Sequence, residues 1–185
     1  MSVKKYFLDE NNAVLLIIDV QERLVPAMPK KELVIKNSLH LIELATMMNI
    51  PIIVTEQYPK GLGKTVSEIQ SALPQYQPIE KKTFCCCREP EFQHRLQTLS
   101  GRTLIVAGME THICVLQTVL SLLDQGLVTH VVQDAACSRS EENEKTGIEF
   151  MRDAGAVITC TETVLFQFLK TAGTEAFKKI SQRIK

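Results

Sequence analysis

The chain has 185 residues, of which 45% are hydrophobic and 23% are charged. This length and composition exclude a disordered or fibrous chain and predict one globular domain over residues 1–185, with a substantial core. The 21 lysines and arginines balance 21 aspartates and glutamates, so the formal net charge at pH 7 is zero. A chain without excess positive charge is not expected to bind nucleic acid or an anionic membrane surface.

No targeting or membrane segment is recognisable. The most apolar run, residues 13–18, is far shorter than the ~20 residues that cross a bilayer, and residues 1–12 do not resemble a signal peptide. We therefore expect a cytoplasmic protein whose six cysteines are free thiols. The cysteines form no C-x-x-C pair and the four histidines show no ligand spacing, so the sequence predicts no metal and no other cofactor.

Predicted strands and helices alternate along the chain. Residues 13–18 form a continuous aliphatic run, which is typical of a strand buried on both faces of a parallel sheet. The expected strands are 13–18, 52–55, 103–107, 130–133 and 156–159, and the expected helices are 30–48, 111–125 and 141–154. This order predicts an α/β fold, a three-layer αβα sandwich around a mainly parallel sheet of roughly six strands.

Residues 57–83 are expected to form one long irregular segment, because glycine, proline and lysine are frequent there. In an open parallel sheet the ligand binds beyond the carboxyl ends of the strands. The residues just after the predicted strands are therefore candidates for a functional site. They are 19–21, 55–58, 108–114 and 134–139.

Cys114 is the candidate nucleophile. Thr111 follows a strand, opens a helix and is a favourable N-cap, which places Cys114 in the first helical turn. The helix dipole and the unpaired N–H groups there are expected to lower the pKa of the thiol and to hold an oxyanion. On position alone, a small buried apolar cysteine is an equally good interpretation.

Asp19 is the candidate partner of that thiol. It directly follows a buried strand, where an ionised group needs a partner or a catalytic role. The structural alternatives for Asp19 are a helix cap and a buried salt bridge.

Five short segments, spread over nearly the whole chain, carry a family resemblance. They read LIIDVQ, TEQYPKGLG, EKKTF, VAGMETHICV and DAACSR, at residues 16–21, 55–63, 80–84, 106–115 and 134–139. Together they resemble the isochorismatase-like cysteine hydrolase family, and most closely its branch of isochorismatase-domain-containing proteins. The resemblance implies the αβα hydrolase fold and is much less specific for a substrate.

The resemblance implies a catalytic triad of Asp19, Lys81 and Cys114. Lys81 is preferred because the family pattern has a lysine, three residues and then a small residue, which here is Cys85. The neighbouring Lys82 remains an alternative.

The resemblance also implies a cis peptide bond between Met109 and Glu110, just before the helix of the nucleophile. Such a bond persists only where the surrounding structure enforces it, often to aim backbone N–H groups. We expect the oxyanion-binding or substrate-binding residues to be Gln21, Tyr58, Met109 and Glu110.

Two departures from related enzymes narrow the function. Nicotinamidases of the superfamily carry a metal-binding Asp-x-His pair where this chain has Glu56, Gln57 and Tyr58, so we expect no catalytic metal. Isochorismatases generally lack the nucleophilic cysteine that is present here as Cys114. This difference favours acyl transfer.

The expected function is metal-free hydrolysis of a small amide, carbamoyl or related carbonyl compound through a thioester on Cys114. One alternative is non-covalent hydrolysis with Asp19 as general acid, and another is a binding or scaffold protein without turnover. A nuclease is disfavoured by the charge balance. The expected partners are a small-molecule substrate and further copies of the chain, in a homo-oligomeric dimer or tetramer, with no nucleic acid and no membrane.

Three further features have two interpretations each. Arg139 is expected to bind a substrate carboxylate or to form an ion pair with Asp134 or Glu162. The consecutive cysteines at residues 85–87 are expected to be small packing residues rather than a redox centre. His112, beside Cys114, is expected to pack internally or to contact another subunit.

Overall fold

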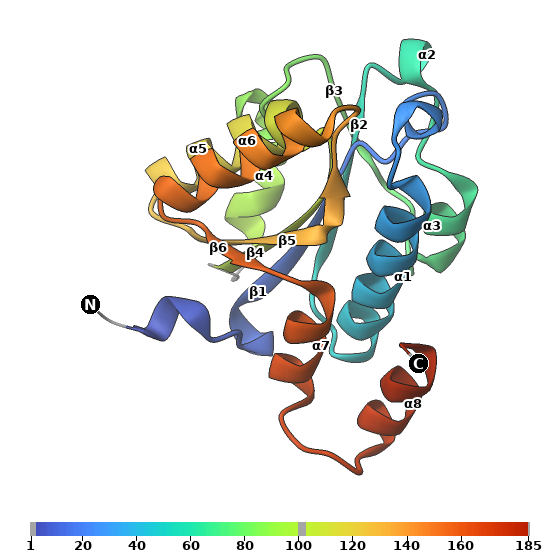
Figure 1. Ribbon diagram of the computed structural model, residues 1–185, viewed down its shortest axis with the longest axis vertical. Coiled ribbons are helices and arrows are strands. Elements are labelled where there is room, and N and C mark those ends of the chain that lie inside the picture. The colour runs from blue at the N-terminus through green and yellow to red at the C-terminus, as the bar shows by residue number, and fades with distance from the viewer. Residues whose placement is uncertain (1–2, 100–102, 185) are drawn as a thin grey trace.

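A six-stranded sheet forms the centre of the protein, in a computed structural model that describes residues 3–99 and 103–184 (Figure 1). Its strands are β1 (Ala13–Ile18), β2 (Ile52–Gln57), β3 (Ile79–Lys81), β4 (Thr103–Met109), β5 (Val128–Cys137) and β6 (Val157–Thr159). Every neighbouring pair is parallel, in the order β3-β2-β1-β4-β5-β6. The predicted α/β fold is confirmed.

Helices cover both faces of this sheet (Figure 1). They are α1 (Lys31–Met47), α2 (Pro59–Leu62), α3 (Ser67–Ala72), α4 (Pro90–Thr98), α5 (Leu116–Asp124), α6 (Glu141–Asp153), α7 (Thr161–Leu169) and α8 (Glu175–Arg183). Shorter turns are η1 (Val3–Tyr6), η2 (Glu10–Asn12), η3 (Val25–Ala27) and η4 (Cys86–Arg88), which are 3-10 helices, and η5 (Thr111–Val115), a π-helical turn.

The side chains of β1 alternate between two hydrophobic cores. Leu15 and Ile17 point into the core that contains α1, α3 and α7, whereas Leu16 and Ile18 point into the core that contains α4, α5 and α6. All six residues of β1 are buried. A continuous aliphatic run is therefore explained by a strand with helices on both sides.

The segment predicted to be irregular, residues 57–83, contains three regular elements, α2, α3 and β3. The sequence pattern missed β3 because a strand of three residues is too short for a recognisable periodicity. Strand β5 also extends beyond the predicted residues 130–133. A bulge lets it resume pairing with β4 at Gly108 and Ala136, so Asp134 lies within the strand and not after it.

The strand order reverses at β1, which lies between β2 and β4. The chain runs outward from β1 through β2 to β3 and then returns to the opposite side of β1 with β4. Such a reversal opens a crevice beyond the carboxyl ends of the two central strands. Asp19 and the turn that carries Cys114 follow these two strands, so the topology brings them together.

Gly108 permits the close approach of β1 and β4 at this point. Its φ is +121°, and a Cβ atom there would lie 2.0 Å from the carbonyl oxygen of Ile18. Glycine is the residue that tolerates both the positive φ and the missing space.

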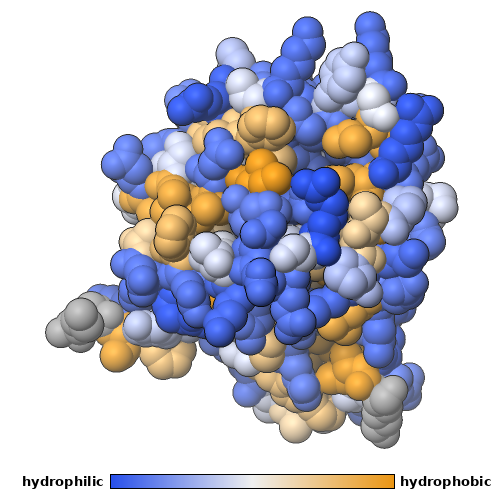
Figure 2. Space-filling view, turned by 45° about the horizontal axis from the view of Figure 1, so that its top comes forward, coloured by the Kyte–Doolittle hydropathy of each residue, from blue (hydrophilic) through white to orange (hydrophobic). Residues whose placement is uncertain are grey.

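Figure 2 shows the molecule turned so that the top of Figure 1 comes forward. The face seen there is mostly hydrophilic, with several separate apolar patches. Among its exposed large apolar residues, Tyr58 and Phe84 follow β2 and β3 at the carboxyl edge of the sheet. Within residues 3–99 and 103–184, no helix is long and apolar enough to cross a membrane.

We expect Gly108→Ala to destabilise the protein by at least about 3 kcal/mol, because the new Cβ would collide with the backbone of β1. The matched control is Gly126→Ala, whose φ is +76° but whose Cβ would meet nothing within 4 Å. It should cost only about 1 kcal/mol. Urea unfolding of both variants measures the difference, and equal losses would contradict the close approach.

Candidate active site

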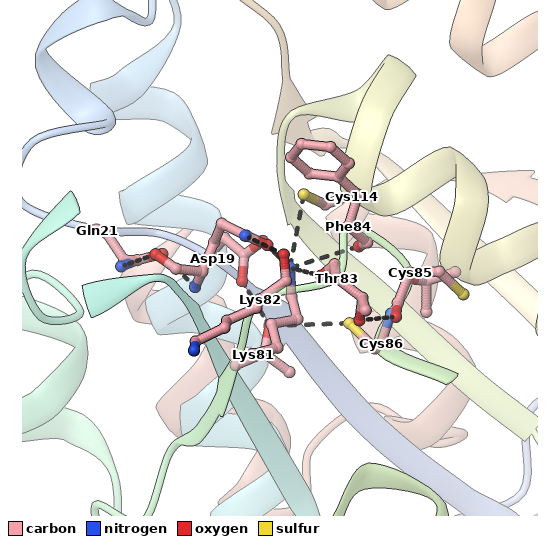
Figure 3. A network of polar contacts seen from close by, with 12 residues as sticks. Asp19, Gln21, Lys81, Lys82, Thr83, Phe84, Cys85, Cys86 and Cys114 are labelled. Carbon is pink, nitrogen blue, oxygen red and sulfur yellow. Dashed lines mark hydrogen bonds and ion pairs between the residues drawn. The ribbon is translucent and has the colours of Figure 1, made fainter. Parts of the chain in front are cut away.

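Three side chains from different parts of the sequence meet beyond the carboxyl end of the sheet (Figure 3). Asp19 follows β1, Lys81 is the last residue of β3, and Cys114 lies in η5 after β4. The Lys81 Nζ atom is 2.7 Å from Asp19 Oδ2 and 3.6 Å from Cys114 Sγ. The side chains of Asp19 and Lys81 are fully buried, and Cys114 is 6% exposed. The fold thus brings together the three residues of the expected triad.

Lys81 reaches the other two residues because its side chain is long. Strand β3 is two places from β1, and adjacent strands lie ~4.8 Å apart, so the two backbones are separated by roughly 10 Å. The next residue, Lys82, is exposed, and its ammonium group lies away from Cys114 (Figure 3). Successive side chains of an extended chain point in opposite directions, so only one of these lysines can face the site.

Asp19 is held by its backbone and by Thr55. Its φ of 55° is left-handed, a conformation that aspartate tolerates better than most residues, and the chain turns there as it leaves β1. The Thr55 hydroxyl donates to Asp19 Oδ1 at 2.7 Å, which leaves Oδ2 for Lys81. Burial raises the pKa of Asp19, although Lys81 and Thr55 oppose this effect. A carboxylate with a raised pKa is a stronger general base.

Cys114 lies in a π-helical turn rather than in a capped α-helix. The carbonyl oxygen of Glu110 accepts hydrogen bonds from the N–H groups of both Ile113 and Val115. Thr111 is the first residue of the turn, and its buried hydroxyl has no hydrogen-bond partner among the described residues. The predicted N-cap role of Thr111 is wrong, because a backbone carbonyl already takes the Ile113 N–H that the cap would bind. π-helical turns are frequent at functional sites.

The predicted lowering of the Cys114 pKa is also wrong. Burial raises the pKa of this thiol, the Asp19 carboxylate raises it further, and Lys81 offsets only part of the increase. Burial by itself would lower the pKa of Lys81, but Asp19 reverses this and raises it. The site therefore raises the pKa of all three groups, through burial for Asp19 and Cys114 and through the Asp19 carboxylate for Lys81.

Glu110 connects the end of β4 to the segment after β5. The Met109–Glu110 peptide bond is cis, as the resemblance implies. The Glu110 carboxylate accepts hydrogen bonds from the backbone N–H of Arg139 at 2.9 Å and from its guanidinium Nε at 3.1 Å. The ion pair expected with Asp134 or Glu162 thus forms with Glu110, and Asp134 instead accepts a hydrogen bond from the first N–H of α7 at 2.7 Å.

Gln21 is fully buried, and its carboxamide is used within the protein. Oε1 accepts from the Gln57 N–H at 2.7 Å, and Nε2 donates to the carbonyl oxygens of Gln57 and Gly63 at 3.0 and 2.7 Å. These contacts support the end of β2, and the expected contact between Gln21 and a substrate stays a prediction.

Tyr58 is an exposed residue directly after β2. It is 52% exposed and lines a cavity of about 490 Å³ beside Lys81. Neither Asp19 nor Cys114 lines this cavity, so the expected contact between Tyr58 and a substrate stays a prediction. The other lining residues are Pro59, Lys60, Glu80, Lys82 and Glu89.

Two residues of the candidate segment 55–58, to which the sequence assigned no individual role, contact the triad. Thr55 binds Asp19, and Gln57 Oε1 accepts a hydrogen bond from Lys81 Nζ at 2.7 Å. Both belong to β2, which lies between β1 and β3 in the sheet. The signal for them was position at the end of a strand, but their contacts follow from the strand order.

Three consecutive cysteines pack against α5. Cys85, Cys86 and Cys87 are all buried, and the Cys86 N–H donates to Thr118 Oγ1 at 3.0 Å. These contacts favour the packing interpretation. A hydrogen bond with Cys87 lowers the pKa of Cys85 to about 6, so Cys85 is a competing thiol in any labelling experiment.

The side chains of Glu56, where nicotinamidases carry a metal ligand, and of His112, expected to pack or to contact another subunit, both bind groups within the protein. Glu56 accepts hydrogen bonds from the Thr65 N–H at 2.6 Å and from the Tyr76 hydroxyl. His112 Nδ1 lies 2.8 Å from Ser138 Oγ. Within the described part of the chain, no group of three His, Cys, Asp or Glu side chains is placed to hold a metal ion.

Comparison with known proteins establishes the family. The Isochorismatase domain model matches residues 13–163. Isochorismatase family protein 1A of Dictyostelium discoideum is 35% identical over 177 residues, covering 94% of this chain and 86% of the relative. The secreted isochorismatase effector Isc1 of Phytophthora sojae is 38% identical over 180 residues, covering 95% and 85%. The chain belongs to the isochorismatase family.

Solved structures share its fold. MAR1 ribonuclease from Caenorhabditis elegans has a TM-score of 0.89 and 35% identity, with 96% of this chain and 92% of that chain covered. YcaC from Pseudomonas aeruginosa, with hexane-2,5-diol and covalent acrylamide, has a TM-score of 0.91 and 26% identity, with 99% and 93% covered. The fold is thus that of isochorismatase-like structures.

We expect Asp19→Asn to lower the pKa of the Cys114 thiol and Lys81→Met to raise it, each by about one pH unit or more, because a nearby charge is removed in each case. The measurement is the pH dependence of iodoacetamide alkylation at Cys114, followed by peptide mapping on a Cys85→Ser background. Lys82→Met is the matched control and should leave the midpoint unchanged. Shifts of the same sign in the Asp19 and Lys81 variants would contradict this electrostatic description.

Proposed function

We propose that this protein is a metal-free cysteine hydrolase that acts on a small amide, carbamoyl or related carbonyl compound through a thioester on Cys114. The observation that carries the proposal is the buried contact set in which Lys81 Nζ lies 2.7 Å from Asp19 and 3.6 Å from Cys114. A nucleophile, a base and a cation placed this way meet the geometric requirements of acyl transfer.

The proposed reaction begins with proton transfer from the Cys114 thiol to Asp19. The sulfur attacks the substrate carbonyl carbon. The resulting oxyanion is held by backbone N–H groups of residues 110–114. The N–H of Ile113 is not among them, because it donates to the carbonyl oxygen of Glu110. Asp19 returns the proton to the leaving amine as the C–N bond breaks, which leaves a thioester. Asp19 then accepts a proton from water, whose oxygen attacks the thioester carbonyl carbon. The C–S bond breaks, the acid is released, and Asp19 returns the proton to Cys114 Sγ, which regenerates the thiol and the carboxylate.

Lys81 has an electrostatic role in this scheme. Its pKa is raised by Asp19, so it remains a cation at neutral pH, near both groups that carry negative charge during the cycle. It stabilises the carboxylate before proton transfer and the thiolate after it. No metal is required for either step.

Two observations on relatives support this proposal. Related YcaC from Pseudomonas aeruginosa carries covalent acrylamide, an electrophile that reacts with thiols. Membership of the isochorismatase family supports hydrolysis as the general reaction. The name of the Caenorhabditis elegans relative suggests RNA cleavage, but the zero net charge of this chain provides no excess of cations for binding phosphates.

The alternatives make different chemical predictions. Non-covalent hydrolysis with Asp19 as general acid would proceed without a thioester, and a scaffold protein would show no turnover. The expected homo-oligomer, a dimer or tetramer, stays a prediction.

We expect Cys114→Ala to reduce hydrolysis of small amides by at least about a thousandfold, because it removes the nucleophile. A panel of primary amides and carbamoyl compounds, assayed for ammonia or amine release, identifies a usable substrate. Cys160→Ala, at a partly exposed cysteine before α7, is the matched control and should retain full activity.

Quench-flow mass spectrometry separates the covalent mechanism from its rival. The wild-type protein should gain the mass of the acyl group at Cys114 during turnover. Undiminished hydrolysis by Cys114→Ala would refute the covalent mechanism, and absence of turnover on the whole panel, together with ordinary thiol reactivity, would favour the scaffold.

A further inference from the structure

We propose that Gln57 is a positioning residue whose side-chain amide holds the Lys81 ammonium group between Asp19 and Cys114. This inference rests on the hydrolase function proposed above, because it assigns a role in the same site. Lys81 Nζ donates to Gln57 Oε1 at 2.7 Å, which equals its distance to Asp19 Oδ2. The ammonium group therefore has two short contacts, one charged and one neutral.

These two contacts determine where the rest of the ammonium group points. An ammonium group has three N–H donors, and two of them are taken by Asp19 and Gln57. The remaining neighbours are Cys114 Sγ at 3.6 Å and the carbonyl oxygens of residues 83 and 84, each at 3.4 Å. The third donor is thus directed toward the sulfur and the loop that follows Lys81.

The orientation of the Gln57 amide is itself fixed. Its Nε2 atom donates to the carbonyl oxygen of Lys82 at 2.8 Å, so the oxygen Oε1 must face Lys81. The backbone N–H and carbonyl of Gln57 are both bound by the buried carboxamide of Gln21. A chain of contacts therefore runs from Gln21 through Gln57 to Lys81.

A neutral acceptor suits this position for an electrostatic reason. A second carboxylate would share the positive charge of Lys81 with Asp19 and weaken its field at the Cys114 sulfur. An amide oxygen accepts the hydrogen bond without that competition. Without Gln57, the ammonium group would keep only Asp19 as a short contact, with the carbonyl oxygens of residues 83 and 84 each at 3.4 Å, and it could move toward Asp19 and away from Cys114.

The test measures the pH dependence of Cys114 alkylation by iodoacetamide in Gln57→Leu, on the Cys85→Ser background. We expect the midpoint to rise by about half a pH unit or more and the rate at pH 7 to fall about threefold or more, because Lys81 stabilises the thiolate less well. The matched control is Gln77→Leu, an exposed glutamine in the same segment. Circular dichroism and urea unfolding verify that the variants are folded.

A double-mutant cycle distinguishes positioning from a general structural effect. On a Lys81→Met background, Gln57→Leu should change the alkylation profile no further, because Gln57 acts through Lys81. Equal shifts with and without Lys81, or a wild-type profile in Gln57→Leu alone, would overturn the proposal. If Gln57→Leu does not fold, the same alkylation profiles are measured for Gln57→Asn, which shortens the side chain by one carbon. The same shift of the midpoint is expected.

This readout is independent of turnover. A protein that hydrolyses nothing on the amide panel still has a measurable Cys114 titration, so the role of Gln57 is decided separately from the proposed function. Once a substrate is known, Gln57→Leu should lower kcat and leave KM within about twofold, because the proposed role of Gln57 is exerted through Lys81.

Discussion

The buried ion pair between Asp19 and Lys81 is the interaction on which the rest of the site depends. Transferring two charges from water into the protein costs several kcal/mol per ion, and the pair is tolerated only with good geometry and additional hydrogen bonds. Here both side chains are fully buried, 2.7 Å apart, and each has a further partner, Thr55 for Asp19 and Gln57 for Lys81. Removing one ion would leave the other uncompensated, at a cost of about 3–5 kcal/mol.

The sheet supplies the geometry that this pair needs. Asp19 follows β1, Thr55 and Gln57 lie at the end of β2, and Lys81 ends β3. Strand β4, on the other side of β1, leads to Cys114. The turn around Cys114 is held from above by α6, where a Cβ on Gly147 would lie 3.0 Å from the Cα of His112. It is tied to β5 through Glu110 and Arg139. Rigid elements thus hold each member of the site.

The electrostatics of the site follow from its burial. A thiol near a helix start is expected to be acidic, but desolvation and a neighbouring carboxylate dominate here and raise its pKa. A resting state with a protonated Cys114 and an ionised Asp19 has the same total charge as one with a thiolate and a protonated carboxyl group. Proton transfer between them therefore moves charge within the site without changing its net charge, which is an arrangement suited to a low-dielectric environment.

The sequence by itself determined the parallel α/β architecture, because buried strands and amphipathic helices are local patterns, and it singled out Asp19 and Cys114 from their places after strands. Family resemblance added Lys81. Only the tertiary structure decided which of two adjacent lysines faces the carboxylate, that Gln57 binds this lysine, and that burial raises the pKa of the Cys114 thiol. These outcomes depend on strand order, on the direction of side chains at strand ends and on desolvation. None of the three is a property of a local stretch of sequence.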